Sequence, residues 1–255
     1  MNTMLSIQKV SLTYHTKQGE IKALGNISFD VCDGEFVAII GPSGCGKTSI
    51  LSIIAGLLKP SEGVVELNGS VVEKPTEQIG YMLQKDQLFP WRTIEANAML
   101  PLEIHKLKKD NEKRKNVELL LKKYGLWEFR KSYPNELSGG MRQRVALIRT
   151  LAFSPKILLL DEPFSALDYQ TRLEVCDDVY KIIKSENKTA LLVTHDISEA
   201  IALADRIIVL TKRPSKILNV HEIDTDKSLS PLKRRESKGF SSWFERLWRE
   251  LNYEK

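Results

Sequence analysis

A glycine-rich run at positions 41–48 has the residue types and spacing of a phosphate-binding loop. Its members are Gly41, Pro42, Ser43, Gly44, Cys45, Gly46, Lys47 and Thr48, and Ser49 follows. The glycines let the backbone fold around a phosphate with its N–H groups pointing inward. We expect Lys47 to contact the outer phosphates and the Thr48 hydroxyl to ligate Mg²⁺.

The surrounding sequence supplies the elements that such a loop needs. The residues at 36–40 are all apolar, as in a strand buried on both faces. A helix is expected from about Lys47 to Leu58, with Pro60 beyond its end. The amino end of this helix adds a dipole that favours bound anions. A chance match to a glycine-rich turn is therefore disfavoured.

A second set of chemical groups follows the apolar run at 157–160, which ends in Asp161 and Glu162. Carboxylates at the carboxyl end of a buried strand lie where α/β sheets bind ligands. Asp161 is expected in the Mg²⁺ shell, and Glu162 is expected to orient or deprotonate an attacking water. Alone, an acidic strand end is equally consistent with a cap of the next turn, and the phosphate-binding loop favours the catalytic interpretation.

A third segment combines a hydroxyl with two glycines at the start of a helix that is expected to reach about Phe153. It reads Leu137, Ser138, Gly139, Gly140, Met141, Arg142, Gln143 and Arg144. Such a helix start offers free N–H groups and predicts a second anion site. As a bare pattern it is only a cap and a turn.

The hydrophobic pattern predicts the framework around these segments. Apolar and polar residues alternate in the first 80 positions, as at Val10, Leu12 and Tyr14, which is typical of strands with one wet face. Residues 91–153 read as helical. From about 155, short apolar runs alternate with helical stretches near 168–185 and 197–204, which predicts a parallel sheet.

Composition excludes several classes of protein. The 255 residues carry a net charge of +5 and three scattered cysteines, which form neither a disulfide framework nor a zinc site. No stretch approaches the ~18 consecutive apolar residues of a membrane span. The amino end lacks the pattern of a secretion signal, and we expect a cytoplasmic chain.

The motifs taken in order resemble the ATP-binding subunit of an ABC transporter. They are the phosphate-binding loop, LSGGMRQR at 137–144, ILLLDEP at 157–163 and VTHD at 193–196. Three segments also resemble the nitrate, sulfonate and taurine importer group: LFPWRT at 88–93, YPNELSGGMRQR at 133–144 and DEPFSALDYQTR at 161–172. The resemblance covers about residues 4–220.

The resemblance assigns roles to further residues. Tyr14 lies where the family stacks an aromatic on adenine, although an edge-strand tyrosine is the alternative. Gln84 looks like the Q-loop glutamine near Mg²⁺ and water. His195 looks like the switch histidine that contacts the γ-phosphate, whereas a lone histidine at a strand end is more often structural. The D-loop, which crosses the dimer interface, corresponds to Ser165, Ala166, Leu167 and Asp168.

The implied fold is α/β, a P-loop NTPase (RecA-like) parallel sheet core with an antiparallel β subdomain and an inserted helical subdomain. Residues 1–86 and 155–222 would form the nucleotide-binding core with its antiparallel β subdomain. Residues 87–154 would form the helical subdomain that carries the signature. Residues 223–255 fall outside the resemblance as a carboxyl-terminal extension.

The resemblance also implies an assembly. Two copies would form an ATP-dependent, head-to-tail homodimer in which LSGG faces the other copy's phosphate-binding loop over ATP and Mg²⁺. Two transmembrane permease subunits would hold the chain at the cytoplasmic face of the cell membrane and work with a solute-binding protein. The expected permease contact lies at 84–102, including Phe89 and Trp91, although these rings are also consistent with packing inside the helical subdomain.

Two rival functions are disfavoured. A nucleic-acid ATPase of this superfamily carries long coiled coils or recognition inserts, and the segment from Gln84 to Ser138 is short and lacks sustained heptads. No nucleic-acid partner is therefore expected. A degenerate cassette that only binds ATP is disfavoured because Lys47, Asp161, Glu162 and His195 are all present.

Two surface features are left with open interpretations. Residues 104–131 carry ten Lys or Arg and four Asp or Glu, so the positive excess lies there. This segment is either a solvated helix face or a surface turned toward an anionic lipid leaflet. Near the carboxyl end, Trp243, Phe244, Leu247, Trp248 and Leu251 recur at helical spacing. We favour packing or regulation over lipid contact for this helix.

Overall fold

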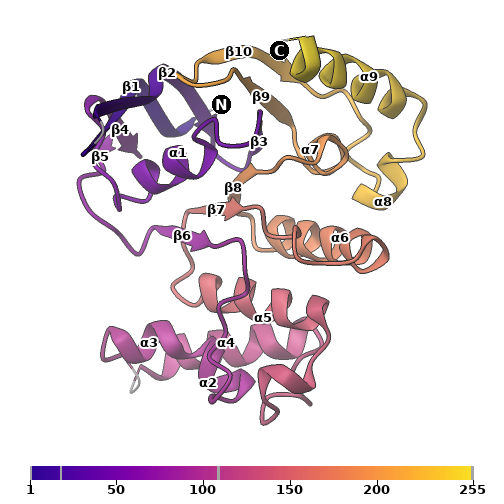
Figure 1. Cartoon of the computed structure of the whole chain (residues 1–255). Helices are drawn as coiled ribbons and strands as arrows, with labels where there is room; N and C mark the ends of the chain where they lie inside the picture. Colours follow the sequence, from indigo (N-terminus) through magenta and orange to yellow (C-terminus); the bar gives the residue numbers. More distant parts are fainter. Residues whose placement is uncertain (1, 18, 108–109, 254–255) are drawn as a thin grey trace. The chain divides into compact units, whose positions relative to one another are not determined.

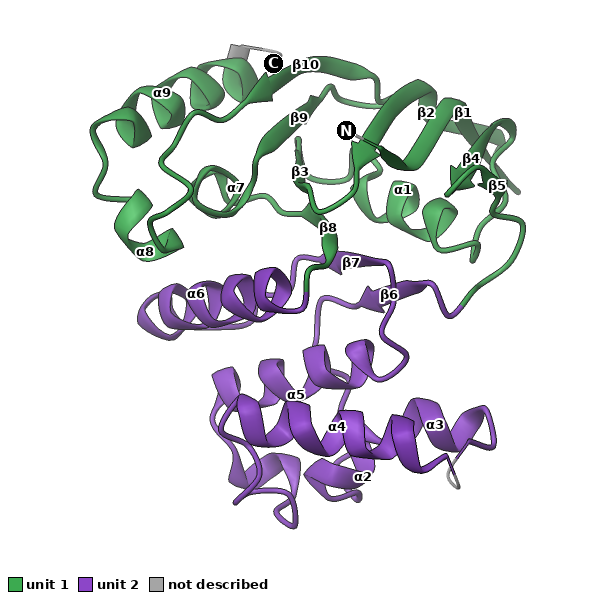
Figure 2. Ribbon diagram, turned by 180° about the vertical axis from the view of Figure 1, so that it is seen from behind, with its two compact units in different colours: residues 1–76, 187–255 green, residues 77–186 purple. Residues whose placement is uncertain are grey.

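The computed structural model describes residues 2–17, 19–107 and 110–253 and divides the chain into two compact units. Unit 1 comprises Met1–Thr76 and Asn187–Lys255, and unit 2 comprises Glu77–Glu186 (Figure 2). Each unit is described by itself. The three-part functional division expected from the sequence stays a prediction.

Unit 1 contains an antiparallel sheet in the order β2-β1-β4-β5 (Figure 1). Its strands are β1 (Thr3–Thr16), β2 (Gly19–Cys32), β4 (Glu62–Leu67) and β5 (Ser70–Val71). The alternation seen in the sequence sets the inward face as far as Leu12, because Val10 and Leu12 are buried while Ser11 and Thr13 are partly exposed. Tyr14, the next residue in the alternation, is exposed. The predicted antiparallel β region is confirmed.

Unit 1 also contains parallel strands. They are β3 (Phe36–Ile40), β8 (Thr189–Val193) and β9 (Arg206–Leu210), and β10 (Ile217–Glu222) pairs with β9 in the antiparallel sense. β3 lies between β8 and β9 and pairs with both in parallel. All five side chains of β3 are buried, as the unbroken apolar run predicts.

Helix α1 (Lys47–Ile54) ends earlier than the sequence pattern suggests. Gly56 adopts a φ of 70° and its N–H donates to the Ile53 carbonyl, while the Leu57 N–H donates to the Ser52 carbonyl. This pair of bonds is a Schellman motif, which stops a helix at a left-handed glycine. The expectation of a helix to Leu58 is therefore wrong, and Gly56 is the reason.

The carboxyl-terminal extension belongs to unit 1 and packs against its other elements. It contains α8 (Pro231–Arg234) and α9 (Lys238–Tyr253), which lie beside α7 (Ile197–Leu203) and β10 (Figure 1). The Leu247 side chain is fully buried, and the His221 ring on β10 lies 2.9 Å from the Glu250 carboxylate. The helix predicted near the carboxyl end is present as α9, and one of its faces packs against α7 and β10.

Unit 2 consists of two parallel strands and a helical region. The strands are β6 (Ile79–Met82) and β7 (Ile157–Asp161). The helices are α2 (Ile94–Ala98), α3 (Leu100–Ile104), α4 (Asn111–Lys123), the 3₁₀ turn η1 (Pro134–Glu136), α5 (Gly139–Leu151) and α6 (Tyr169–Ser185). These elements confirm the α/β class and the helical middle of the chain.

Helix α4 turns one face inward. Leu120 and Leu121 are buried with Val117, whereas Leu119 is 62% exposed. Part of the basic segment 104–131 contacts aromatic rings, because the cationic groups of Lys122 and Arg130 each lie 4.4 Å from the centre of the Trp127 ring. Lys108 and Lys109 of that segment lie outside the described residues.

Across the described ranges, no helix is long and apolar enough to cross a membrane.

The end of α1 generates a prediction about stability. A Cβ on Gly56 would lie 2.5 Å from the backbone carbon of Lys74, whereas a Cβ on Gly69 meets no atom within 4 Å. The two glycines have similar φ values, 70° and 73°. Gly69→Ala is therefore expected to lower the free energy of unfolding by about 1 kcal/mol, the cost of the left-handed backbone alone. Gly56→Ala is expected to cost about 3 kcal/mol or more because the clash is added.

Urea unfolding followed by circular dichroism checks this prediction on the two variants in parallel. Equal losses in both variants would show that the close approach to Lys74 carries no energy.

Candidate functional site

The phosphate-binding loop joins the carboxyl end of β3 to the amino end of α1 in unit 1. Gly44 and Gly46 have φ values of 73° and 105°, which residues with a Cβ rarely adopt. Lys47 is 6% exposed and its Nζ donates to the carbonyls of Gly41 and Pro42 at 2.9 and 3.1 Å. The ammonium group thus lies folded over the loop, where an outer phosphate would meet it.

The first glycine of the loop is closely packed. A Cβ on Gly41 would lie 3.0 Å from the Cys45 Sγ and 3.0 Å from the Leu210 Cβ. Cys45 is itself buried, and burial raises the pKa of its thiol although the nearby Lys47 opposes the shift. The thiolate form of Cys45 is therefore disfavoured.

The strand pairing in unit 1 places His195 at the same sheet edge as the loop. β3 and β8 run in parallel with Ile39 opposite Val193, and the Thr194 N–H donates to the Ile39 carbonyl at 3.2 Å. The Thr194 hydroxyl donates to the buried Glu199 carboxylate at 2.6 Å, which fixes this residue. His195 follows with its side chain exposed.

Tyr14 on β1 contacts the helix that carries the loop. Its hydroxyl lies 3.0 Å from the Ser49 hydroxyl in the first turn of α1, and the residue is 39% exposed. A ring that is anchored at its tip and open to solvent has the properties of a stacking platform. The three parts predicted from separate regions of sequence, namely Tyr14, the loop and His195, thus belong to one unit.

Unit 2 brings the acidic residues and the predicted Q-loop glutamine together. β6 and β7 pair in parallel with Met82 opposite Leu160, so the residues after both strands lie at one edge. The Gln84 Nε2 donates to the Glu162 Oε2 at 3.3 Å. Asp161 is 5% exposed and accepts a bond from the Tyr81 hydroxyl at 3.3 Å.

Glu162 has an unusual backbone for a residue with a side chain. Its φ is 45°, in the left-handed region, and its carbonyl accepts bonds from the N–H and the hydroxyl of Ser165 at 3.2 and 3.0 Å. These two bonds hold a turn that the residue would not adopt by itself. The D-loop serine therefore shapes the backbone at the acidic pair.

The signature segment is also defined by close packing. The Ser138 hydroxyl accepts a bond from the Met141 N–H and caps α5. A Cβ on Gly139 would lie 2.8 Å from Leu167 of the D-loop, and one on Gly140 would lie 2.7 Å from Val175 of α6. Asp168 caps α6, and its bonds with Thr171 lower the pKa of its carboxyl. The glycine pair thus lets the signature pack against the D-loop and α6.

The side chains expected to bind Mg²⁺ come from both units and carry oxygen donors. Thr48 offers a hydroxyl, Gln84 an amide oxygen and Asp161 a carboxylate, which are ligand types that Mg²⁺ prefers. The described parts of the chain contain no cluster of three His, Cys, Asp or Glu side chains that would hold a metal alone.

Two site residues were missed by sequence reasoning. Tyr81, the partner of Asp161, is an ordinary strand residue in the sequence. Arg213, in the segment after β9, donates from its Nε to the Gly44 carbonyl of the phosphate-binding loop. Arg213 lies near the loop because β9 is the second parallel neighbour of β3. The sequence does not reveal this strand order, so it gave no signal for Arg213.

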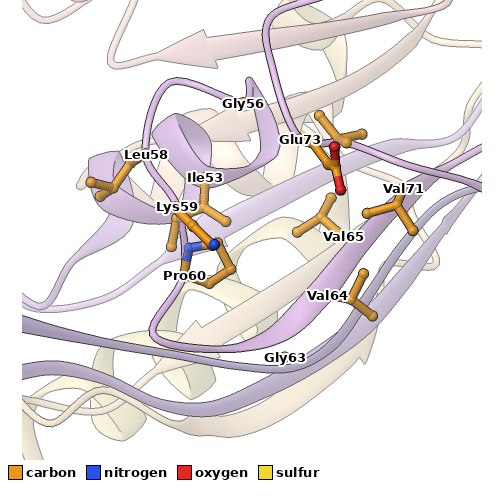
Figure 3. A pocket seen from close by; sticks show the side chains of 11 residues that line it. Ile53, Gly56, Leu58, Lys59, Pro60, Gly63, Val64, Val65, Val71 and Glu73 are labelled. Atoms are coloured by element: carbon orange, nitrogen blue, oxygen red, sulfur yellow. The ribbon is translucent and has the colours of Figure 1, made fainter.

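A hollow at the far end of α1 is not the phosphate site. Its volume is about 390 Å³, it lies between the end of α1 and the strands β4 and β5, and Figure 3 shows the side chains that line it. Its walls are mostly apolar, with Lys59 and Glu73 at its sides. It begins at Ile53 and Gly56, at the opposite end of α1 from the loop, so the helix dipole there disfavours anions.

Known protein sequences are similar to this chain over most of its length. The ABC transporter family matches residues 24–165. The uncharacterized ABC transporter ATP-binding protein YtlC of Bacillus subtilis is 45% identical over 251 residues, covering 98% of this chain and 96% of the relative. The aliphatic sulfonates import ATP-binding protein SsuB of Bacillus cereus is 42% identical over 218 residues, with coverages of 86% and 85%. The taurine import ATP-binding protein TauB of Jannaschia sp. is 41% identical over 216 residues, with coverages of 84% and 80%.

Solved structures give the same result. The dimeric post-hydrolysis structure of the ATP-binding cassette MJ0796 bound to ADP and Pi has a TM-score of 0.72 and 34% identity, covering 88% of this chain and all (100%) of that chain. The structure of cbiO1 from Clostridium perfringens, part of the ABC transporter complex cbiONQ, has a TM-score of 0.77 and 25% identity, with coverages of 99% and 96%. The predicted P-loop NTPase fold is confirmed, and the resemblance to the sulfonate and taurine importer proteins is borne out. This chain belongs to the ABC transporter family, as one of its ATP-binding ATPase subunits.

Proposed function

We propose that this chain binds and hydrolyses ATP to energise the uptake of a small solute of the nitrate, sulfonate or taurine type through separate membrane subunits. The observation that carries the proposal is the contact between Gln84 and Glu162 beside Asp161, at the shared edge of β6 and β7. The importer names of SsuB and TauB support the direction of transport and the class of solute.

Unit 1 would hold the nucleotide. Lys47 and the backbone N–H groups of the loop would bind the phosphates, and the Tyr14 ring would stack on the adenine. His195, exposed at the neighbouring strand end, would contact the γ-phosphate. In phosphoryl transfer most of the catalysis comes from such positioning and from charge neutralisation.

Unit 2 would supply the hydrolytic groups. Glu162 would orient the attacking water and accept its proton, while the Gln84 amide bonds the same carboxylate. Asp161, Gln84 and Thr48 would hold Mg²⁺, which neutralises charge on the phosphates when bound. The Tyr81 hydroxyl would keep the Asp161 carboxylate oriented.

The signature would act on a second copy of the chain. Leu137, Ser138, Gly139, Gly140, Met141, Arg142 and Gln143 form a capped helix start whose N–H groups suit a γ-phosphate. We propose a head-to-tail homodimer that closes on ATP and reopens after hydrolysis, with the D-loop at the interface. The dimeric state of MJ0796 supports this arrangement.

The remaining assignments follow the same proposal. Residues 1–86 and 155–222 would form the nucleotide-binding core, and residues 87–154 the helical signature subdomain. Two permease subunits would place the chain at the cytoplasmic face of the membrane and receive the solute from a solute-binding protein. The permease contact would include the loop at 87–92, where Trp91 is 72% exposed.

The assigned base gives one prediction. Glu162→Gln is expected to keep ATP binding but to lower the rate of hydrolysis by at least about 100-fold, because the amide does not accept a proton. The variant should also accumulate as an ATP-bound dimer. Phosphate release and gel filtration with ATP measure both effects.

The exposed residue Glu174 on α6 offers a matched control, since Glu174→Gln makes the same chemical change away from the site. Wild-type hydrolysis by Glu162→Gln would remove Glu162 from its assigned role.

The proposed permease contact gives a second prediction. Single cysteines placed at position 87 or 92, in a chain whose native cysteines are replaced, are expected to crosslink to a transmembrane subunit in the assembled transporter. Both positions flank Trp91, whose side chain is exposed, so this loop is open to a partner. A cysteine at 174 serves as the control position, and the products are read on a denaturing gel. A functional complex that yields no crosslink from 87 or 92 would contradict docking at this loop.

A further inference from the structure

One arginine of the signature helix contacts both the loop after Gln84 and the residue before Ser138. The Arg142 Nε donates to the Asp86 Oδ2 at 3.0 Å. A second nitrogen of the same guanidinium donates to the Leu137 carbonyl at 2.8 Å. A planar guanidinium that forms both bonds fixes the separation of its two partners. The side chains are 36% and 27% exposed, so the pair is partly shielded from water.

A second arginine of α5 fixes the backbone of the same loop. Arg149 donates to the Gln87 carbonyl at 2.7 Å and to the Asp86 carbonyl at 2.6 Å. Burial lowers the pKa of Arg149, and the nearby Asp86 carboxylate opposes that shift. The Asp86 carboxylate also accepts a bond from the Leu88 N–H at 3.1 Å. The loop is therefore joined to α5 through three separate hydrogen bonds. The bond from the Leu88 N–H lies within the loop and holds the Asp86 carboxylate.

The rest of the loop is held by one buried amide. The Asn97 side chain on α2 accepts a bond from the Phe89 N–H at 2.8 Å. It donates to the carbonyls of Phe89, Arg92 and Thr93 at 3.0–3.1 Å. Asn97 has no exposed surface. A loop with its backbone groups bonded in this way moves as a piece, while it presents the Trp91 ring to solvent.

We infer that the Asp86–Arg142 ion pair is a positioning element that couples the loop carrying Trp91 to the signature serine. The inference rests on the proposed function, in which that loop contacts a permease and the signature contacts ATP on a second copy. A displacement of the loop pulls on Asp86, passes through Arg142 to the Leu137 carbonyl, and moves Ser138 at the start of α5. Coupling between two sites is reciprocal, so binding at the signature also restrains the loop.

Hydrogen exchange on the full chain tests this coupling without a permease. In the Glu162→Gln background, ATP is expected to slow exchange in peptides covering 137–142 and, through the ion pair, in peptides covering 85–93. Asp86→Asn keeps an oxygen acceptor for the Leu88 N–H and removes the charge that faces Arg142. In this variant ATP should still protect 137–142, but its protection of 85–93 should fall by about fivefold or more.

Two further variants separate coupling from folding. Asp86→Glu restores a carboxylate and is expected to recover the ATP-dependent protection of 85–93. Glu103→Gln serves as a matched control. Glu103 forms an ion pair with Arg92 at 2.6 Å, and this pair joins the loop to α3 and not to α5. The substitution removes the charge of Glu103. It should leave the protection at both segments unchanged.

The outcomes are distinct. If 85–93 stays protected in Asp86→Asn, the ion pair carries no coupling and the inference is overturned while the proposed function stands. If ATP does not protect 137–142 in the Glu162→Gln chain, the proposed head-to-tail dimer fails and the inference fails with it.

Discussion

Parallel strand pairing is the constraint on which the site depends. In unit 1 the pairing of Ile39 with Val193 puts the phosphate-binding loop and His195 at one sheet edge. In unit 2 the pairing of Met82 with Leu160 does the same for Gln84 and Glu162. A slip of one residue would move the groups after one strand by about 3.3 Å relative to those after its neighbour, so the register decides which groups meet. The chemistry is therefore located by the hydrophobic pattern as much as by the polar residues.

Local sequence predicted the segments of the site but not their partners. The loop at 41–48, the acidic pair after β7 and the capped start of α5 each follow from a short run and the element beside it. The end of α1 was predicted too late because the pattern continued apolar to Leu58, whereas a single left-handed glycine stops the helix. Arg213 and Asp86 were missed because their contacts depend on which elements become neighbours in space. Such contacts are set by packing, which a single sequence does not display.

The acidic pair includes a residue with a strained backbone, Glu162. A glutamate with a φ of 45° costs about 1–2 kcal/mol relative to an ordinary conformation, since its Cβ crowds the next carbonyl. The buried strand β7 before it and the two Ser165 bonds after it hold that geometry. A glycine at this position would remove the strain together with the carboxylate. A glutamate in this conformation is consistent with a carboxylate that has to point at a fixed place.

The positive charge of the chain has a different origin from its phosphate chemistry. The excess lies in residues 104–131, and several of those cations are already engaged. Lys122 and Arg130 lie against Trp127, and Lys123 bonds Glu186 at 2.6 Å, a contact that raises the pKa of Lys123. In the proposed mechanism the loop at 41–48 would bind phosphate through Lys47, which is almost buried, and through the N–H groups of its own backbone. A buried ammonium is screened far less by salt than surface charges are, so the proposed phosphate contact does not depend on the basic surface.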